Sequence, residues 1–318
     1  MQKDVLDLFS GCGGLSLGFE DAGYNTIAGI ERDESAAKTF EENLEAECFV
    51  DDLTEIEPTD FGRKDPDIIV GGPPCQDFSV CNYYSRGGDK TNLVFVFADW
   101  VEYFQPEVFV MENVPGIVSV RNVFQNLIKQ FEQMGYVISS KILDSVNYSV
   151  PQTRQRMFIV GMKDSRYNFP EQKYGQLRTV EDAFADLPSV KSGEENDLFN
   201  NHKAPNHSNE TIEKFRKLSF EEPVYESWGE KIRLHPNKPS PTLKAGKRST
   251  FHFVHPFENR GLTIRERARL QSFPDSFIFH GTMTDKRTQT GNAVPPKLAK
   301  VIAEEIENAS DKTGVFDY

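Results

Sequence analysis

One cysteine of the chain, Cys75, is presented as a reactive thiol would be. It follows two glycines and two prolines in the stretch GGPPCQDFS, directly after DIIV, a short apolar run typical of a buried strand. A cysteine that merely fills a core needs no such rigid lead-in, because free cysteines usually pack as small apolar side chains. At the carboxyl end of a strand, where open α/β sheets bind ligands, this residue can act as a nucleophile.

Three further polar residues stand where they could serve that thiol. Glu112 ends the apolar run VFVMEN, and a glutamate is rarely buried without a role. Arg154 and Arg156 alternate in PQTRQRMFIVG before another apolar run, so we expect both guanidinium groups on one face of a strand. Their positive field would lower the pKa of a neighbouring thiol, although a solvated strand edge would show the same alternation.

The N-terminal stretch DLFSGCGGLSLGFE has the composition of a ligand-binding loop. Gly11, Gly13 and Gly14 lie between a predicted strand and a predicted helix, where glycines let the backbone approach a ligand closely. Glu31 ends the next predicted strand, where a carboxylate can hold ribose hydroxyls. The nicotinamide fingerprint G-x-G-x-x-G would require a glycine in place of Ser16. The loop therefore suits S-adenosylmethionine better than a pyrophosphate, with a tight structural turn as the alternative.

Alternating strand and helix patterns in the first half must position these residues. Strands are predicted at 4–9, 26–31, 67–72, 108–113, 137–145 and 156–162, the last two paired, with Asp52 near the end of a further one. Helices are predicted at 15–23, 34–44, 93–104, 122–135, 263–274 and 295–309. This alternation predicts the α/β fold class with a parallel sheet. From about 165 to 260 the polar composition indicates a second lobe with little regular structure.

The composition argues against several classes of protein. No apolar run approaches the roughly 18 residues of a membrane span, and the N-terminus lacks the pattern of a secretory signal. The four cysteines form no C-x-x-C pair and have no histidine at zinc-ligand spacing beside them. We therefore expect a cytoplasmic protein with no membrane contact, no metal and no disulfide framework.

The charge distribution matters more than its sum. The net charge of −13 argues at first against a nucleic-acid partner. Residues 231–300, however, hold 14 Lys and Arg against 4 Asp and Glu. A basic segment on an acidic body predicts a local polyanion site, and a basic solvated face is the alternative.

Eight blocks of the sequence, taken together, resemble DNA (cytosine-5) methyltransferases of the prokaryotic restriction–modification type. From residue 4 to about 300, in family order, they are DLFSGCGGLSLGFE, GIERD, DDL, GGPPCQDFS, MENV, QTRQR, RERARLQSFPDSF and TQTGNAVPP. The resemblance implies a Rossmann-like, S-adenosylmethionine-dependent catalytic domain at 1–165 and 288–318. It also implies a smaller, irregular target-recognition domain at 166–287.

The resemblance assigns roles to the residues singled out above. The thiolate of Cys75 would add to C6 of a cytosine flipped out of the duplex, making C5 nucleophilic. Glu112 would hold N4 and protonate N3, Arg156 would contact O2, and Arg154 would support the site. The loop at 76–92 would close over the base.

The resemblance also implies two binding surfaces. Residues expected to bind S-adenosylmethionine are Phe9, Gly11, Gly13, Glu31, Asp52, Pro73, Asn292 and Val294. One departure is Arg32, which stands where relatives often place an aromatic against the adenine. Residues expected to contact duplex DNA are Gln76, Ser79, Lys244, Lys247 and Arg248, the last three in SPTLKAGKRSTFHFVHP.

Two other functions stay open at this point. One is a tRNA cytosine-5 methyltransferase of the same fold, disfavoured by the serine of PPCQDFS and by the absence of an obvious RNA module. The other is a DNA-binding relative without catalysis, disfavoured because all four candidate catalytic residues are present. We expect a monomer; a cognate restriction endonuclease is a candidate partner that need not bind it.

Overall fold

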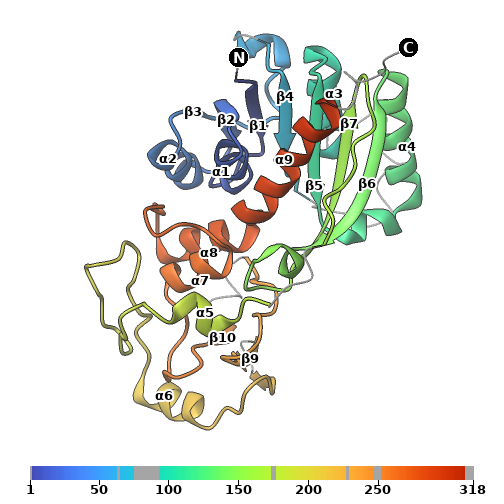
Figure 1. Ribbon diagram of the computed structural model, residues 1–318. Helices are drawn as coiled ribbons and strands as arrows, with labels where there is room; N and C mark the ends of the chain where they lie inside the picture. Colours follow the sequence, from blue (N-terminus) through green and yellow to red (C-terminus); the bar gives the residue numbers. More distant parts are fainter. Residues whose placement is uncertain are drawn as a thin grey trace. The chain divides into compact units, whose positions relative to one another are not determined.

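A computed structural model describes residues 2–62, 65–74, 93–172, 177–226, 229–245 and 252–311. The chain divides into two compact units (Figure 1). Unit 1 comprises residues 1–144, 155–171 and 298–318, and unit 2 comprises residues 145–154 and 172–297.

The bounds of these units differ from those expected from the sequence, which were 165/166 and 287/288. Residues 145–154 fall in unit 2 because they bond there. The side chain of Gln152, for example, accepts a hydrogen bond from the backbone N–H of Leu243 at 2.8 Å. The backbone N–H of Thr153 donates to the carbonyl of Ser240.

Unit 1 is built on a seven-stranded sheet of order β3-β2-β1-β4-β5-β7-β6. The strands are β1 (Asp4–Leu8), β2 (Asn25–Glu31), β3 (Glu47–Val50), β4 (Ile68–Gly71), β5 (Val108–Asn113), β6 (Val137–Asp144) and β7 (Gln155–Met162). β1 to β5 run parallel, whereas β7 is antiparallel to both β5 and β6. The α/β class is thus confirmed. The predicted parallel arrangement holds for β1 to β5, and the two final strands pair with each other as predicted, with β7 antiparallel to β5 as well.

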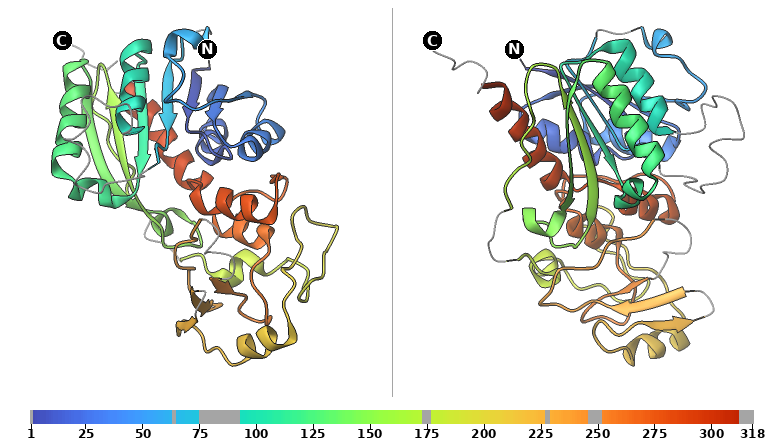
Figure 2. Two further views of the ribbon diagram at one scale, coloured as in Figure 1. Left: turned by 180° about the vertical axis from the view of Figure 1, so that it is seen from behind. Right: turned by 90° about the vertical axis from the view of Figure 1, so that its right-hand side faces the viewer.

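Helices and 3₁₀ turns connect the strands of unit 1. They are α1 (Gly14–Asp21), α2 (Glu34–Asn43), η1 (Pro58–Phe61), α3 (Leu93–Phe104), η2 (Pro115–Ser119), α4 (Arg121–Gln133) and α9 (Pro296–Asp311), whose first two residues fall in unit 2. Figure 2 shows α3 and α4 on one face of the sheet and α9 on the other. No helix among the described residues is long and apolar enough to cross a membrane.

Burial explains why these segments fold as they do. All six residues of β5 are buried, as a strand covered on both faces requires. On α4 the buried residues Val123, Leu127 and Phe131 recur every four positions and form one apolar stripe. That stripe packs into a core with Phe97 and Phe109. The core leaves the carboxyl ends of the parallel strands to loops, and the described parts of those loops carry Phe9, Gly11, Gly13, Asp52 and Pro73.

Unit 2 has little regular structure, as expected. Its elements are η3 (Ser145–Tyr148), α5 (Val180–Phe184), α6 (Asn209–Arg216), β8 (Val224–Glu226), β9 (Gly229–Arg233), β10 (Phe253–Val254), α7 (Ile264–Leu270) and α8 (Met283–Asn292). A small core of Val180, Phe184, Leu234, Leu243 and Leu270 lies among them.

Helix α8 was not predicted from the sequence. It lacks an apolar stripe, which is the signal that a periodicity search detects. Its start is marked instead by a capping box, in which Thr282 accepts from the backbone N–H of Asp285 and the Asp285 carboxylate accepts from that of Thr282.

Candidate active site

The strongest feature of the predicted catalytic centre is an ion pair in unit 1. Nε of Arg156 lies 2.7 Å from Oε1 of Glu112. β5 supplies Glu112 at its carboxyl end and β7 supplies Arg156 near its start. Glu112 is buried, so the contact is shielded from water and stronger than an exposed pair. The pair fixes the carboxyl group at the edge of the sheet where a ligand is expected.

A second contact fixes the loop that leads to Cys75. The side-chain amide of Asn113 donates to the carbonyl of Pro73 at 3.1 Å, and its oxygen accepts from the N–H of Val114 at 2.8 Å. The backbone of Gly72 passes so close that a Cβ there would lie 3.1 Å from Oε2 of Glu112. Glycine at 72 and the amide at 113 therefore set the distance between the two loops.

Several predicted residues lie outside the described part of the chain. They are the candidate nucleophile Cys75, the candidate DNA contacts Gln76, Ser79, Lys247 and Arg248, and the loop at 76–92. Their assignments stay predictions from the sequence.

The glycine-rich loop after β1 bonds to the predicted ribose-binding residue. The backbone N–H of Gly11 donates to Oε2 of Glu31 at 3.0 Å, and the N–H of Asp33 donates to Oε1 at 2.9 Å. Gly11 adopts φ +55°, and a Cβ there would meet no atom within 4 Å, so open space adjoins the loop. Phe9 adopts φ +56°, a strained conformation for a bulky residue that is found mostly at functional sites.

Asp52 lies just after β3 at the same edge of the sheet. Its carboxylate accepts hydrogen bonds from the backbone and hydroxyl of Thr54, which lower its pKa. A guanidinium nitrogen of Arg32 lies 3.8 Å from Asp52, and both side chains are substantially exposed. Arg32 is thus placed beside one of the predicted cofactor residues.

These groups fit S-adenosylmethionine. Glu31 supplies a carboxylate, the backbone N–H groups around it preorganise that carboxylate, and the open space at Gly11 leaves room beside the loop. Burial raises the pKa of Glu31. A ligand that donates hydrogen bonds to this carboxylate would therefore stabilise its ionised form. Among the described residues, no cluster of histidine, cysteine, aspartate and glutamate is arranged to hold a metal ion.

A buried carboxyl group, Asp7, lies beneath this loop. Oδ2 of Asp7 accepts from the hydroxyl of Ser16 in α1 at 2.6 Å, and both side chains are buried. Burial raises the pKa of Asp7 to about 7, helped by the nearby charge of Glu31 and opposed by the bond from Ser16. Nothing in the sequence marks this group beyond its place in the DLF stretch.

Arg154 bonds to backbone carbonyls, whereas Arg156 pairs with a carboxylate. Its side chain is fully buried in unit 2, where it donates to three carbonyls: Leu243 at 3.3 Å, Gly291 at 2.9 Å and Asn292 at 3.1 Å. Of the predicted cofactor residues in that unit, Asn292 is exposed and Val294 is buried. Arg154 therefore bonds to main chain of unit 2, and its role in supporting the catalytic site stays a prediction.

The basic segment 231–300 is less available to DNA than its charge suggests. Six of its cations are buried: Lys231, Arg233, Arg260, Arg265, Arg267 and Arg287. Arg265, for instance, donates to the carbonyls of Asn200, Pro274 and Phe277. The charge of the segment therefore does not all face solvent, and the local polyanion site stays a prediction. Lys244 remains exposed and stays a candidate DNA contact.

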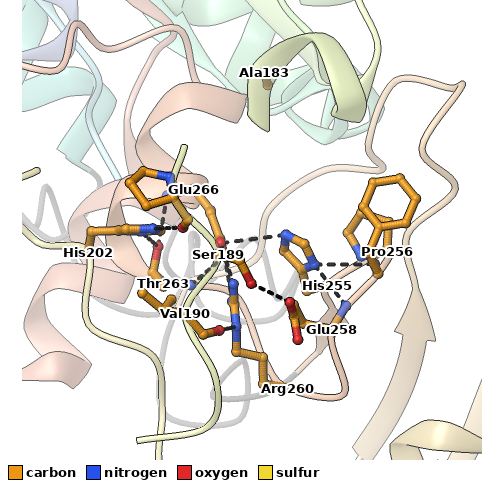
Figure 3. A network of polar contacts seen from close by, with 12 residues as sticks. Ala183, Ser189, Val190, His202, His255, Pro256, Glu258, Arg260, Thr263 and Glu266 are labelled. Carbon is orange, nitrogen blue, oxygen red and sulfur yellow. Dashed lines mark hydrogen bonds and ion pairs between the residues drawn. The ribbon is translucent and has the colours of Figure 1, made fainter. Parts of the chain in front are cut away.

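Glu266, in the block RERARLQSFPDSF, lies in a network of polar contacts inside unit 2 (Figure 3). Arg260 donates two parallel hydrogen bonds to Glu266, at 2.9 and 2.8 Å, and a third bond to Glu266 comes from the backbone N–H of Thr263. Burial alone would raise the pKa of Glu266, but the charge and hydrogen bonds of Arg260 lower it. Glu266 thus ties the start of α7 to Arg260 inside the unit.

Three residues that hold the loops described above were not singled out from the sequence. Asn113, Gln152 and Arg267 all stand inside blocks that were quoted, namely MENV, QTRQR and RERARLQSFPDSF. The only signal in the sequence was the presence of an amide or guanidinium side chain within such a block. The bonding partner of each side chain is a backbone group distant in sequence, which the block does not reveal.

The chain is similar to known proteins over most of its length. A family model for C-5 cytosine-specific DNA methylase matches residues 3–308. The type II methyltransferase M.DdeI of Desulfomicrobium norvegicum is 34% identical, over 95% of this chain and 88% of that protein. The type II methyltransferase M1.HphI of Haemophilus parahaemolyticus is 36% identical, over 96% of this chain and 87% of that protein.

A solved structure agrees with these matches. A protein encoded within an Escherichia coli prophage, provisionally assigned as a DNA modification methyltransferase, superposes with a TM-score of 0.79. It is 28% identical, and the match covers 98% of this chain and 100% of that one. The similarity thus extends over nearly the whole chain.

Proposed function

Since the chain belongs to the C-5 cytosine-specific DNA methylase family, it is a DNA cytosine-C5 methyltransferase, and we propose that it acts through a covalent adduct with a flipped base. The observation that carries this mechanism is the buried Glu112–Arg156 pair beside the loop that leads to Cys75. It brings a carboxyl group and a guanidinium to the edge of the sheet from which the candidate nucleophile emerges.

The first step belongs to Cys75. Cytosine C5 is a poor nucleophile because its ring is electron-poor. When the thiolate adds to C6, the C5–C6 electron pair becomes available at C5, which then behaves as an enamine carbon. After methylation a base removes the C5 proton, the double bond reforms and the thiolate leaves. A base stacked in the duplex cannot present C6 in this way, so it must first be flipped out.

Glu112 and Arg156 act on the polar edge of the same ring. As negative charge develops, Glu112 protonates N3 and holds the N4 amino group, while Arg156 contacts O2. The 2.7 Å contact between them orients the carboxyl group before the base arrives. A positioned acid of this kind contributes roughly 10²–10⁴-fold in rate.

The proposed cofactor site is made by the residues that the family resemblance names. Phe9, Gly11, Glu31, Asp52 and Pro73 would contact S-adenosylmethionine, with Gly13 shaping the loop; the remaining contacts would come from Asn292 and Val294. When bound, S-adenosylmethionine supplies an electrophilic methyl group. Glu31 holds the ribose, because its carboxylate already accepts two backbone N–H groups that fix its orientation.

Unit 2 is proposed to read the DNA sequence. It holds 21 Lys and Arg against 16 Asp and Glu, whereas unit 1 holds 15 against 33. A polyanion is therefore attracted to unit 2 and repelled by most of unit 1. Lys244, Lys247 and Arg248 are the proposed contacts, with Gln76 and Ser79 reaching DNA from the catalytic loop. Methylation of a short site would protect host DNA against a cognate restriction endonuclease.

The decisive experiment maps the methyl groups. DNA from cells that express the protein is treated with bisulfite and sequenced, and protected cytosines should share one short sequence. The variant Cys75→Ala should leave no protection while binding S-adenosylhomocysteine normally. Purified protein is also offered duplex DNA and total tRNA with labelled S-adenosylmethionine. Label in tRNA alone would contradict DNA as substrate and favour the tRNA alternative.

A further inference from the structure

Asp7 is a buried carboxyl group to which the proposed mechanism gives no role, and only one of its oxygens is hydrogen-bonded. Oδ2 accepts from the hydroxyl of Ser16 at 2.6 Å. Oδ1 is buried and has no hydrogen-bond partner among the described residues. An ionised carboxylate with a missing bond is costly in a buried place, unless a positive charge lies within electrostatic reach. The ionised form of Asp7 therefore depends on a cation nearby.

Asp7 lies beneath the loop that is proposed to bind the cofactor. It stands in β1, two residues before Phe9, whose φ is +56°. In the parallel pairing with β2 it is opposite Gly29, two residues before Glu31. The negative charge of Glu31 helps to raise the pKa of Asp7, so the two carboxyl groups are within electrostatic reach. A charge that arrives beside Glu31 will therefore also act on Asp7.

The groups around Asp7 in the described part of unit 1 do not supply that cation. The titratable groups coupled to its charge are Glu31, Cys12 and Cys48. Burial raises the pKa of each thiol to about 12, so both stay neutral near pH 7. Arg32 offsets part of the charge of Glu31, but Asp7 forms no ion pair with a lysine or arginine of the described chain. The site is thus poised for a positive charge from a ligand.

The proposed methyl donor brings such a charge, and its product does not. S-adenosylmethionine carries a sulfonium cation. Once the methyl group has left, the sulfur of S-adenosylhomocysteine is an uncharged thioether. The two ligands are otherwise alike, so a nearby carboxylate distinguishes them by one unit of charge. Attraction between unit charges acts over distances longer than a hydrogen bond, and it is strengthened where water is excluded.

From this arrangement we propose that Asp7 is a specificity-determining residue through which the site prefers the charged methyl donor to its uncharged product. This rests on the proposed function, because it takes S-adenosylmethionine as the ligand of the loop at 9–13. Asp7 acts through its charge, since its side chain is almost wholly buried. The attraction is mutual, so donor binding favours the carboxylate, and the proton of the carboxyl group passes to solvent. When product replaces donor, the carboxylate takes a proton back.

Ser16 adjusts this carboxyl group. It is the residue that breaks the nicotinamide fingerprint, where a glycine would stand. Its hydroxyl lowers the pKa of Asp7 by donating to Oδ2. A glycine would remove that bond, and Asp7 would stay protonated to higher pH. The serine therefore keeps the carboxyl group close to the point at which one added charge can ionise it.

The test compares donor and product in the absence of DNA, so that no methyl group is transferred. Calorimetry gives the Kd of S-adenosylmethionine and of S-adenosylhomocysteine at several values between pH 5.5 and pH 8. Burial raises the pKa of Asp7 to about 7, so the group is neutral at the first pH and ionised at the last. In the wild type, the preference for the donor should increase across this range by of the order of tenfold.

In Asp7→Asn the preference should not gain this increase. Asp21→Asn removes an exposed carboxyl group at the end of α1 and is the matched control, which should behave as the wild type does. Ser16→Ala keeps Asp7 but removes its hydrogen bond, so the increase should move to higher pH. Titration of the ligands' own amino groups is common to all four proteins and cancels when they are compared.

Proton release provides a readout that needs no variant. A tenfold preference lowers the pKa of Asp7 from about 7 to about 6 when the donor binds. At pH 6.5 the donor should therefore release about half a proton more than the product does, measured by calorimetry in two buffers of different ionisation enthalpy. Equal proton release in the wild type, or the same pH dependence in Asp7→Asn as in the wild type, would overturn the proposal. If the protein bound neither ligand, the proposed cofactor itself would be wrong, and this inference would fail with it.

Discussion

The guanidinium of Arg156 touches the carboxylate of Glu112 across two antiparallel strands, Nε to Oε1, at 2.7 Å. The pair leaves the second carboxylate oxygen near Gly72, where a side chain would crowd it. One oxygen of Glu112 is therefore engaged by a cation, and the other lies beside Gly72, three residues before Cys75 in the sequence. This arrangement makes the acid role of Glu112 testable.

Glu112→Gln should lower the single-turnover rate of methyl transfer by roughly 10²–10⁴-fold. The amide keeps the shape and can accept from Arg156, but it cannot donate a proton to N3. Binding of S-adenosylhomocysteine should not change. Glu107→Gln, at the exposed end before β5, is the matched control and should react as the wild type does. A rate reduced only a few-fold in Glu112→Gln would remove it from the acid role.

Asn113→Asp should slow adduct formation. The carboxylate keeps an acceptor for the N–H of Val114, but it has no donor for the carbonyl of Pro73 and repels that oxygen. The readout is the rate at which duplex DNA with 5-fluorocytosine at the mapped site traps the protein covalently. Tyr136→Phe, which also removes a bond to a buried proline carbonyl, is the control and should trap at the wild-type rate.

Asp7→Asn should change how stability depends on pH. Burial raises the folded-state pKa of Asp7 to about 7, above its unfolded value of 3.8, so the fold favours the protonated form. As pH rises from about 4 to about 7, the contribution of Asp7 to the free energy of unfolding of the wild type falls, by of the order of 4 kcal/mol, and it levels off above that range. The amide variant lacks this contribution at every pH.

Urea unfolding at pH 5, 6, 7 and 8 measures the difference. The stability of Asp7→Asn relative to the wild type should rise with pH across this series. Asp21→Asn removes an exposed carboxyl group at the end of α1 and should follow the wild type. If Asp7→Asn and the wild type run in parallel at all four pH values, the pKa of Asp7 is not raised by folding.

Replacing Lys244, Lys247 and Arg248 together by alanine should weaken DNA binding and flatten its dependence on salt. Removal of one phosphate-binding cation should reduce the slope of log affinity against log salt by about 0.9. The control replaces three cations of α6 and its C-cap by alanine: Lys214, Arg216 and Lys217. Binding is measured at several salt concentrations, and an unchanged slope in the first variant would show that the loop does not face DNA.

Much of unit 1 could be predicted because its signals are local. β5 matched its predicted bounds, since VFVMEN is a continuous apolar run that ends in polar residues. Glu112 could be singled out for the same reason: it stands near the end of that run. α8 was missed, because only its capping box marks it. Sequence periodicity reports burial of an apolar face, whereas the buried residues of α8 are Arg287, Gln289, Thr290 and Gly291.

The buried arginines that stabilise unit 2 could not be predicted for a different reason. Basic residues in a polar segment look solvated, yet Arg233 is buried and donates to the carbonyls of Phe215, Leu218 and His255. Such a contact joins a side chain to main chain far along the sequence, and no spacing rule encodes it. The same property made the segment look more available to DNA than it is.

The buried arginines of unit 2 affect which side chains of the unit can be replaced without loss of stability. Arg154, Arg265 and Arg267 bond mainly to carbonyl oxygens, which every residue type carries. A loop held by its carbonyls can exchange its outward side chains freely, provided that the path of its main chain is kept. If unit 2 reads DNA as proposed, the residues that contact bases can therefore be replaced while the main chain and its buried arginines stay the same, and a new target sequence need not cost the unit its stability.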